Sequence, residues 1–292
     1  MRYFLEREFI QGLGEKVKTA RNIFLFLDYD GTLTPIRKKP EMALLSPAAR
    51  NNIISLSSSP RIVLTIVSGR ALDEIHRLIN LAHINYVGNH GLEIQTGSLR
   101  EEISPAGEIK KNIALFCQKI KRSTKAYSGI LVENKGLTAS IHYRLAKSKI
   151  LPELRKIVSS VISPFRKKYE LRDGKKVLEI KPKTRRNKGW ATDKIIRLYD
   201  GKRNSSSLYF YFGDDLTDED AFKLINLRRG FSILLAKGGR SSEARYYLEN
   251  SNEVHLFLTW LRKELNLSKN KKPSRYKSFI SDLKKEYKKL NM

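Results

Sequence analysis

Residues 24–34 read FLFLDYDGTLT, and this stretch carries the strongest structural signal in the chain. Four apolar residues, Phe24 to Leu27, end abruptly at Asp28, which is typical of a buried strand in a parallel sheet. Gly31 then breaks the strand, because glycine tolerates backbone angles that most residues avoid. The pattern therefore places Asp28 and Asp30 where a parallel strand stops, which is where open α/β sheets bind ligands.

The two aspartates have the right spacing for phosphoryl transfer. Asp28 and Asp30 are two residues apart, so on an extended segment their side chains point to the same side. One carboxylate can attack phosphorus and form an aspartyl-phosphate, and the second can exchange a proton with the leaving oxygen and then with water. Because two close carboxylates repel, we expect a divalent cation between them. A plain Asp-Gly turn after a strand explains the same residues without catalysis, so both interpretations stand at this point.

Composition fits a globular protein with a large α/β domain and a smaller one. The chain has 292 residues, of which 40% are apolar and 30% charged. Its one cysteine, Cys117, cannot form an internal disulfide, so we expect a reducing compartment and a cytoplasmic protein. No apolar stretch is long enough to span a bilayer, and charges near the start interrupt any secretory signal. We therefore expect no membrane partner.

The net charge of +27 allows two interpretations. A nucleic-acid or membrane-surface role is one of them. The other is a general abundance of lysine, combined with a site for an anionic substrate. The charge is spread along the chain, and no paired CxxC or aromatic RNA-binding signature accompanies it. We favour the second interpretation and expect no nucleic-acid partner.

Hydrophobic patterns predict the remaining elements in outline. Strands are expected at 61–67, 86–87, 129–133, 137–143, 169–172, 177–181, 207–212 and 231–235, and helices at 1–20, 47–56, 71–79, 109–120, 151–161, 187–199, 243–249 and 254–265. Between residues 104 and 186 the order is helix, hairpin, helix, hairpin, which predicts a small α+β unit inserted into the larger sheet domain. The second hairpin is expected to turn at Asp173-Gly174. The basic tail from Ser268 has apolar residues at helical spacing, so we expect an amphipathic helix that packs on the core or frays.

Polar residues follow two more of the expected strands. Ser68, Gly69 and Arg70 come between a strand and a helix, where a hydroxyl and a helix N-terminus can cradle phosphate. An ordinary N-cap has the same sequence pattern. His90 lies in the loop after the next strand, where it can contact substrate or serve only as a satisfied loop residue. Arg70 and His90 are therefore candidates for substrate binding.

A lysine and a run of acids complete the candidate site. Lys188 opens a helix and can neutralise charge on a nucleophile and phosphate, or be a simple surface charge. The strand at 207–212 is followed by GDDLTDED, which contains five acids in seven residues. Carboxylates crowded at a strand end suggest a hard cation such as Mg²⁺, which prefers oxygen ligands. We assign metal binding to Asp214, with Asp215 as a further candidate, and helix capping to Asp218 and the acids after it.

Taken together and in order, the motifs resemble the trehalose-6-phosphate phosphatase family of the haloacid dehalogenase superfamily. They read DYDGTLTPI, VSGR, GNHGLE, VENK, SIHYR, LEIKP, NKG and GDDLTDEDAF. The resemblance covers roughly residues 20–265 and implies an α/β fold, with a Rossmann-like parallel-sheet core and an inserted α/β cap domain. It implies a phosphatase core at 1–103 and 187–267, a cap at 104–186, and a basic tail at 268–292 that lies outside the family pattern.

The resemblance also implies a role for each matching residue of the core. Asp28 matches the nucleophile and Asp30 the general acid/base, while Ser68 matches the phosphate-binding hydroxyl. Lys188 matches the lysine of the third motif. Asp214 matches the Mg²⁺ carboxylate, joined by Asp28 and the main-chain oxygen of Asp30. Two further acids resemble supporting residues, Asp215 and Asp218.

In the cap, four residues resemble those that hold the sugar hydroxyls: Glu133, Lys135, Arg144 and Glu179. Solvated strand edges explain these charges equally well without the resemblance. The family implies Mg²⁺-dependent hydrolysis of trehalose 6-phosphate by a protein that we expect to be monomeric. The nearest alternative is a related phosphatase acting on sucrose 6-phosphate or on a mannosyl- or glucosyl-glycerate phosphate. A remoter alternative is a basic nucleic-acid-binding protein.

Overall fold

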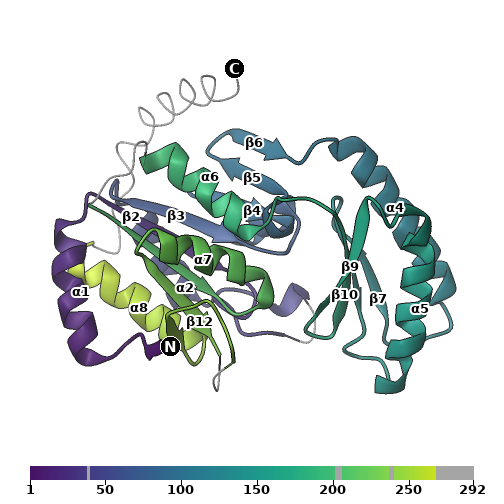
Figure 1. The fold of residues 1–292 in the computed structure, drawn as a ribbon. Coiled ribbons are helices and arrows are strands. Elements are labelled where there is room, and N and C mark those ends of the chain that lie inside the picture. The colour runs from purple at the N-terminus through teal and green to yellow at the C-terminus, as the bar shows by residue number, and fades with distance from the viewer. Residues whose placement is uncertain (38–39, 201–205, 237–239, 268–292) are drawn as a thin grey trace. The chain divides into compact units, whose positions relative to one another are not determined.

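The computed structural model describes residues 1–37, 40–200, 206–236 and 240–267 (Figure 1). The chain divides into two compact units. The larger contains the described residues up to Glu101 and those from Arg186 onward, and the smaller is Glu102–Arg185. Within the described ranges, no helix is both long enough and apolar enough to cross a membrane. The helix expected after Ser268 lies outside the described residues.

The larger unit is built on a nine-stranded sheet, counted over the described residues. In spatial order its strands are β1 (Arg2–Tyr3), β13 (Tyr246–Leu248), β12 (Phe231–Leu235), β11 (Ser207–Gly213), β2 (Asn22–Asp28), β3 (Ile62–Val67), β4 (Asn85–Gly88), β5 (Glu93–Thr96) and β6 (Leu99–Glu102). The central strand β2 pairs in parallel with β11 on one side and with β3 on the other. The carboxyl ends of these three strands therefore meet at one edge of the sheet.

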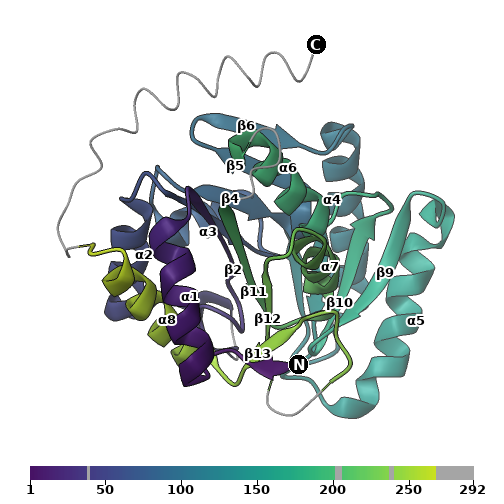
Figure 2. The same cartoon turned by 60° about the vertical axis from the view of Figure 1, so that its left-hand side comes forward.

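Helices cover both faces of this sheet, as Figure 2 shows. On one face lie α1 (Arg7–Thr19), α2 (Pro47–Ser57), α3 (Leu72–Ile79) and α8 (Ser251–Glu264), and on the other α6 (Lys188–Asp200) and α7 (Glu219–Leu227). In β2, Leu25 and Leu27 pack toward the first group, whereas Phe24 and Phe26 pack toward the second. Burial on both faces explains why β2 is apolar at consecutive positions. The predicted α/β class is confirmed.

Three details of the larger unit differ from the expectations. The sheet is mixed, because β5 pairs antiparallel with β4, and neither β5 nor β6 was predicted. The expected helix at 1–20 begins only at Arg7, because residues 2 and 3 pair with β13. The helix expected at 243–249 is wrong, since this segment contains β13, which pairs with β12 and β1 at the sheet edge. The two incorrect helix predictions, at residues 1–6 and 243–249, have the same cause: pairing with distant strands outweighs local helix propensity.

The smaller unit combines an antiparallel sheet with two helices. Its strands follow the order β7 (Leu131–Asn134), β8 (Ala139–His142), β10 (Val177–Pro182) and β9 (Tyr169–Gly174). The helices are α4 (Ala106–Ser123) and α5 (Leu151–Ile162), which pack on each other. Over both units, the described residues also contain short 3₁₀ turns: η1 (Pro40–Met42), η2 (Asn89–Gly91), η3 (Ser148–Ile150), η4 (Ser163–Phe165) and η5 (Leu216–Asp218).

The turn of the second hairpin in this unit lies later than predicted. Gly174 pairs with Val177, so the turn residues are Lys175 and Lys176, not Asp173 and Gly174. Lys176 takes the left-handed conformation with φ 66°, which the sequence pattern would assign to a glycine. Cross-strand register therefore overrides the Asp-Gly turn preference here.

Candidate active site

Asp28 is the last residue of β2, and it is buried at the carboxyl edge of the large sheet. Lys188, the first residue of α6, donates from Nζ to Asp28 Oδ1 at 2.7 Å and to Asp218 Oδ1 at 2.8 Å. Lys188 is only 2% exposed, so both ion pairs form away from bulk water. Of the two interpretations of Lys188, surface charge and site residue, the structure excludes surface charge.

Two acids from the loop after β11 join Asp28 and Lys188. Carboxylate oxygens of Asp28, Asp214 and Asp218 all lie within 4.8 Å of one another. Asp218 is fully buried and accepts a hydrogen bond from the Tyr211 hydroxyl at 2.8 Å. Its other oxygen accepts from the backbone N–H of Asp214, which holds the loop around it. The structure thus brings Asp28 into one cluster with acids that follow a different strand.

The loop after β2 approaches Asp214 so closely that it requires glycine. Gly31 has φ +91°, in the left-handed region that other residues rarely adopt. A Cβ atom at this position would lie 2.1 Å from Asp214 Oδ2. The Asp-Gly step predicted as a strand break is therefore also the contact between the two acidic loops.

The cluster carries uncompensated negative charge. Three carboxylates face one ammonium, so two negative charges remain when all are ionised. Burial raises the pKa of Asp28 well above its usual range, Lys188 opposes this shift, and the Asp218 and Asp214 charges reinforce it. Burial acts to lower the pKa of Lys188, but the two carboxylates outweigh it and raise the pKa. A donor set made only of oxygens with excess negative charge fits a hard divalent cation such as Mg²⁺.

Asp215 and Asp218 cap the η5 turn together, and Asp218 has a second place in the buried cluster. The Asp215 side chain accepts from the Leu216 N–H at 2.6 Å and caps the η5 turn. Asp218 caps the turn as expected, because its side chain accepts from the Asp215 N–H at 3.1 Å, and it differs from the expectation only in that it also lies in the buried cluster with Lys188. The difference has a physical reason: the partners that bury Asp218, Tyr211 and Lys188, come from other elements and leave no local signal.

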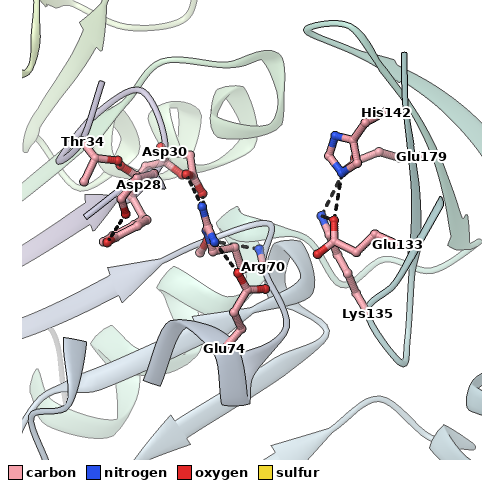
Figure 3. Close-up of polar contacts among 12 residues, drawn as sticks. Asp28, Asp30, Thr34, Arg70, Glu74, Glu133, Lys135, His142 and Glu179 are labelled. Carbon is pink, nitrogen blue, oxygen red and sulfur yellow. Dashed lines mark hydrogen bonds and ion pairs between the residues drawn. The ribbon is translucent and has the colours of Figure 1, made fainter. Parts of the chain in front are cut away.

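Asp30, the other aspartate of the first motif, points to a different partner. Arg70 donates from Nε to Asp30 Oδ2 at 2.7 Å and from Nη2 to Asp30 Oδ1 at 2.8 Å (Figure 3). The same guanidinium forms an ion pair with Glu74 in the first turn of α3, the helix that begins two residues after Arg70. Burial acts to lower the pKa of Arg70, but Asp30 and Glu74 outweigh it and raise the pKa. The arginine predicted to bind substrate is therefore engaged by two carboxylates.

The Ser68 loop is fixed by hydrogen bonds to the segment after β4. Ser68 is buried, and its Oγ accepts from the Arg70 N–H at 3.1 Å. The His90 N–H donates to the Ser68 carbonyl at 3.1 Å, and the His90 ring covers Gly69. Glu93, which the sequence analysis gave no role, accepts from the Leu72 N–H at 3.0 Å and so ties β5 to the start of α3. His90 thus lies beside the Ser68 loop.

In the smaller unit, three of the four predicted sugar-binding residues gather on one face of the antiparallel sheet. Lys135 Nζ lies 4.0 Å from Glu133 Oε2 and 3.7 Å from Glu179 Oε1 (Figure 3). The fourth, Arg144, donates instead to the Lys175 carbonyl in the β9–β10 turn, and no contact with the other three is recorded.

Two further residues of this face, Ser140 and His142, had no predicted role. His142 Nε2 lies 2.9 Å from Glu133 Oε2, and Ser140 Oγ donates to Glu179 Oε1 at 3.3 Å. A signal for them existed in the sequence. Ser140 and His142 alternate along β8, and Ser140 pairs directly with Glu133 and Glu179 on the neighbouring strands, so strand periodicity puts all four on one face.

Comparison with known proteins identifies the family. The trehalose-phosphatase family model matches residues 26–252. Trehalose-phosphate phosphatase B of Arabidopsis thaliana is 33% identical over 258 residues, which cover 84% of this chain and 68% of that protein. A probable trehalose-phosphate phosphatase 4 of Oryza sativa subsp. japonica is 34% identical over 257 residues, which cover 85% of this chain and 69% of that protein.

Solved structures share the fold. The C-terminal domain of the C. albicans trehalose-6-phosphate phosphatase superposes with a TM-score of 0.74 at 23% identity, over 87% of this chain and 96% of that one. An Aspergillus fumigatus trehalose-6-phosphate phosphatase superposes with a TM-score of 0.61 at 26% identity, over 90% of this chain and 99% of that one. The chain therefore belongs to the trehalose-phosphatase family and is a phosphoric monoester hydrolase.

Proposed function

We propose that the protein hydrolyses trehalose 6-phosphate to trehalose and phosphate through an aspartyl-phosphate on Asp28, with Mg²⁺ as its cofactor. The observation that carries the proposal is the buried cluster at the end of β2, where Asp28 contacts Lys188 and lies within 4.8 Å of Asp214 and Asp218. The substrate follows from the relatives, which are named trehalose-phosphate phosphatases. Membership of the haloacid dehalogenase superfamily, a monomeric state and a cytoplasmic location are parts of the same proposal.

The residues of the chain divide the chemistry between them. Lys188 offsets charge on Asp28 and on the arriving phosphate, because catalysis of this kind depends mainly on positioning and electrostatics. Asp28 Oδ attacks phosphorus while the bond from phosphorus to the sugar oxygen breaks. Asp30 gives its proton to that oxygen, and then takes one from the water that attacks the phosphoryl group and frees Asp28.

Mg²⁺ would be held by the carboxylates of Asp28 and Asp214 and the main-chain oxygen of Asp30, and it supplies charge neutralisation at the phosphoryl group. Asp218 contributes by holding Lys188 and the backbone of the Asp214 loop in place. Ser68, which directly follows β3, would donate a hydrogen bond to a phosphate oxygen.

A substrate panel tests the proposal most directly. Purified protein with added Mg²⁺ should release phosphate from trehalose 6-phosphate with a higher kcat/KM than from sucrose 6-phosphate, glucosyl-glycerate phosphate or mannosyl-glycerate phosphate. A higher kcat/KM for one of the other three would replace the proposed substrate but leave the phosphatase chemistry standing. Binding to mixed-sequence DNA without any phosphatase activity would contradict both.

Replacing Asp214 by asparagine should weaken Mg²⁺ binding by at least about tenfold, because even residues behind the direct ligands typically contribute that much. Isothermal titration calorimetry with MgCl₂ measures the affinity, and phosphate release over a range of Mg²⁺ concentrations checks it independently. EDTA should abolish turnover of the unmodified protein, and MgCl₂ should restore it. Asp193→Asn is a matched control, since Asp193 lies on α6 and pairs with Arg197 and Arg228 away from the cluster. Unchanged Mg²⁺ affinity in Asp214→Asn would remove this residue from the metal site.

Replacing Glu133 by glutamine should raise KM for trehalose 6-phosphate by about 10- to 100-fold, the effect of losing one hydrogen bond to a charged group. KM for p-nitrophenyl phosphate should stay within about twofold, because this substrate has no sugar hydroxyls to lose. Glu108→Gln on α4 serves as the control, since Glu108 forms an exposed pair with Lys168. Equal changes in KM for both substrates would count against sugar recognition by this face of the smaller unit.

A further inference from the structure

The ion pair between Arg70 and Asp30 is asymmetric. Arg70 is 5% exposed, whereas the Asp30 side chain retains 40% of its exposure. The arginine is also held from several sides: its guanidinium pairs with Glu74 and lies over the Tyr29 ring at 5.5 Å from the centroid. Its backbone N–H donates to Ser68 Oγ. Arg70 is therefore the fixed member of the pair and Asp30 the one that can move.

The pair is bidentate, and this fixes more than distance. Two parallel N–H···O bonds define both the plane and the direction of a carboxylate, which one contact to a point charge cannot do. Proton transfer requires the donor oxygen to lie within hydrogen-bond reach of the leaving oxygen, and small misplacements are costly. The Asp30 side chain is 40% exposed, and within the described residues its carboxylate makes no hydrogen bond or ion pair other than those with Arg70 that would fix its plane.

The charges around Arg70 argue against a direct role in binding phosphate. Asp30 and Glu74 together outweigh the guanidinium charge, so the trio is net negative. A phosphate dianion approaching Arg70 would meet two carboxylates at the same place. The guanidinium is thus better suited to hold a carboxylate than to receive the substrate.

We propose that Arg70 is the positioning residue for proton transfer by Asp30, and that Glu74 holds Arg70 in place for this task. The inference rests on the proposed role of Asp30 and replaces the substrate-binding role predicted for Arg70. When the P–O bond to the sugar breaks, one proton moves from Asp30 to the sugar oxygen. In the second half-reaction the water oxygen forms a bond to phosphorus, the P–O bond to Asp28 breaks, and one proton moves from that water back to Asp30. Arg70 orients the carboxylate for both transfers and takes up no proton itself.

Leaving groups of different basicity separate this role from phosphate binding. A sugar alkoxide needs a proton as it departs, whereas p-nitrophenolate is a stable anion and leaves without one. Single-turnover rates should be measured for trehalose 6-phosphate and for p-nitrophenyl phosphate, following the first release of p-nitrophenolate so that hydrolysis of the aspartyl-phosphate does not contribute. With Arg70→Met we expect the rate for the sugar phosphate to fall on the order of 10- to 100-fold, a part of the ~10²–10⁴-fold that general acid–base catalysis supplies. The factor by which the rate for the aryl phosphate falls should be at least about ten times smaller than that for the sugar phosphate.

Two further variants keep the test decisive if Arg70→Met does not fold. Arg70→Lys keeps the charge but loses the bidentate contact, and should show the same selective slowing. Glu74→Gln does not alter the Arg70–Asp30 contact directly, so it should slow the sugar phosphate selectively but by a smaller factor. Arg61→Lys is the matched control, because Arg61 donates to the carbonyls of Val17 and Ala20 at the end of α1; thermal stability should fall with no difference between substrates.

Each outcome decides between the possible roles. Equal slowing of both substrates by Arg70→Met and Arg70→Lys, or an equal rise in KM, would overturn the proposal in favour of phosphate binding. Unchanged rates would also overturn it. Asp30→Asn gives the reference: if it slows both substrates equally, the role of Asp30 falls, and the role of Arg70 with it. If Asp30→Asn is selective and the Arg70 variants are not, only the Arg70 proposal fails. Should trehalose 6-phosphate not be a substrate, any sugar phosphate that is turned over provides the same alkoxide leaving group.

Discussion

Asp28→Asn should be folded and should show no measurable turnover, with kcat reduced by more than about 10³-fold. The amide cannot act as the nucleophile that forms the aspartyl-phosphate, so the reaction loses its covalent step and retains only binding and electrostatic contributions. Phosphate release from trehalose 6-phosphate measures the loss. Transfer of ³²P from substrate to acid-precipitated protein should occur with the unmodified chain and not with the variant. A variant with full activity would remove Asp28 from the nucleophile's position.

The same substitution should stabilise the metal-free protein. The pKa of Asp28 is raised on folding, chiefly by burial, so the folded state favours the uncharged form. Stability linked to this group is therefore fully present below the unfolded pKa of 3.8 and is lost as pH rises through the folded pKa. Asparagine mimics the uncharged form at all pH values. In EDTA at neutral pH, Tm should rise by about 2–4 °C, equivalent to roughly 1 kcal/mol in a protein of this size.

Lys188→Met should lose both activity and stability. The substitution leaves Asp28 and Asp218 buried beside each other without their shared cation, and removing one partner of a buried pair typically costs about 3–5 kcal/mol. Urea denaturation in EDTA measures the free energy of unfolding. Lys194→Met on the same helix is the control, because Lys194 is 29% exposed in its pair with Glu101 and should change stability by no more than about 1 kcal/mol.

A second substitution identifies the cause of that loss. Adding Asp218→Asn to Lys188→Met removes one of the two carboxylates that Lys188 contacted and should recover part of the lost free energy. Catalytic activity should not return, since the ammonium beside Asp28 is still absent. If Lys188→Met is as stable as the unmodified protein, the carboxylates around it are protonated in the folded state, and the charge balance described for the cluster is wrong.

The sheet was predictable from sequence wherever a strand is buried on both faces. Phe24–Leu27 and 207–212 are apolar at consecutive positions because helices cover both sides of β2 and β11. The three residues of β13 were not predictable, since Tyr246–Leu248 become a strand only by pairing with β12 and β1. Local sequence carries no information about such an edge partner.

The site was predictable to the extent that its residues end strands. Asp28, Ser68 and Asp214 were found because each follows an apolar run, and parallel strands that share a sheet bring their carboxyl ends together. The burial of Asp218 and the pairing of Arg70 with Asp30 depend on side chains from other elements. Arg144, which follows β8, donates to the Lys175 carbonyl of the β9–β10 turn, a contact that its motif did not predict, and its sugar-binding role stays a prediction.

The position of β2 between β3 and β11 has a consequence for synthesis on the ribosome. One long hydrogen-bonding edge of Asn22–Asp28 can pair as soon as β3 emerges, but the other has to wait for Ser207–Gly213. At the usual rates of translation that delay is roughly 10–40 s. During it, a strongly apolar strand is exposed along one side, which invites premature association with other nascent chains. We expect the first hundred residues to need shielding by a chaperone until the late strand arrives and closes the gap.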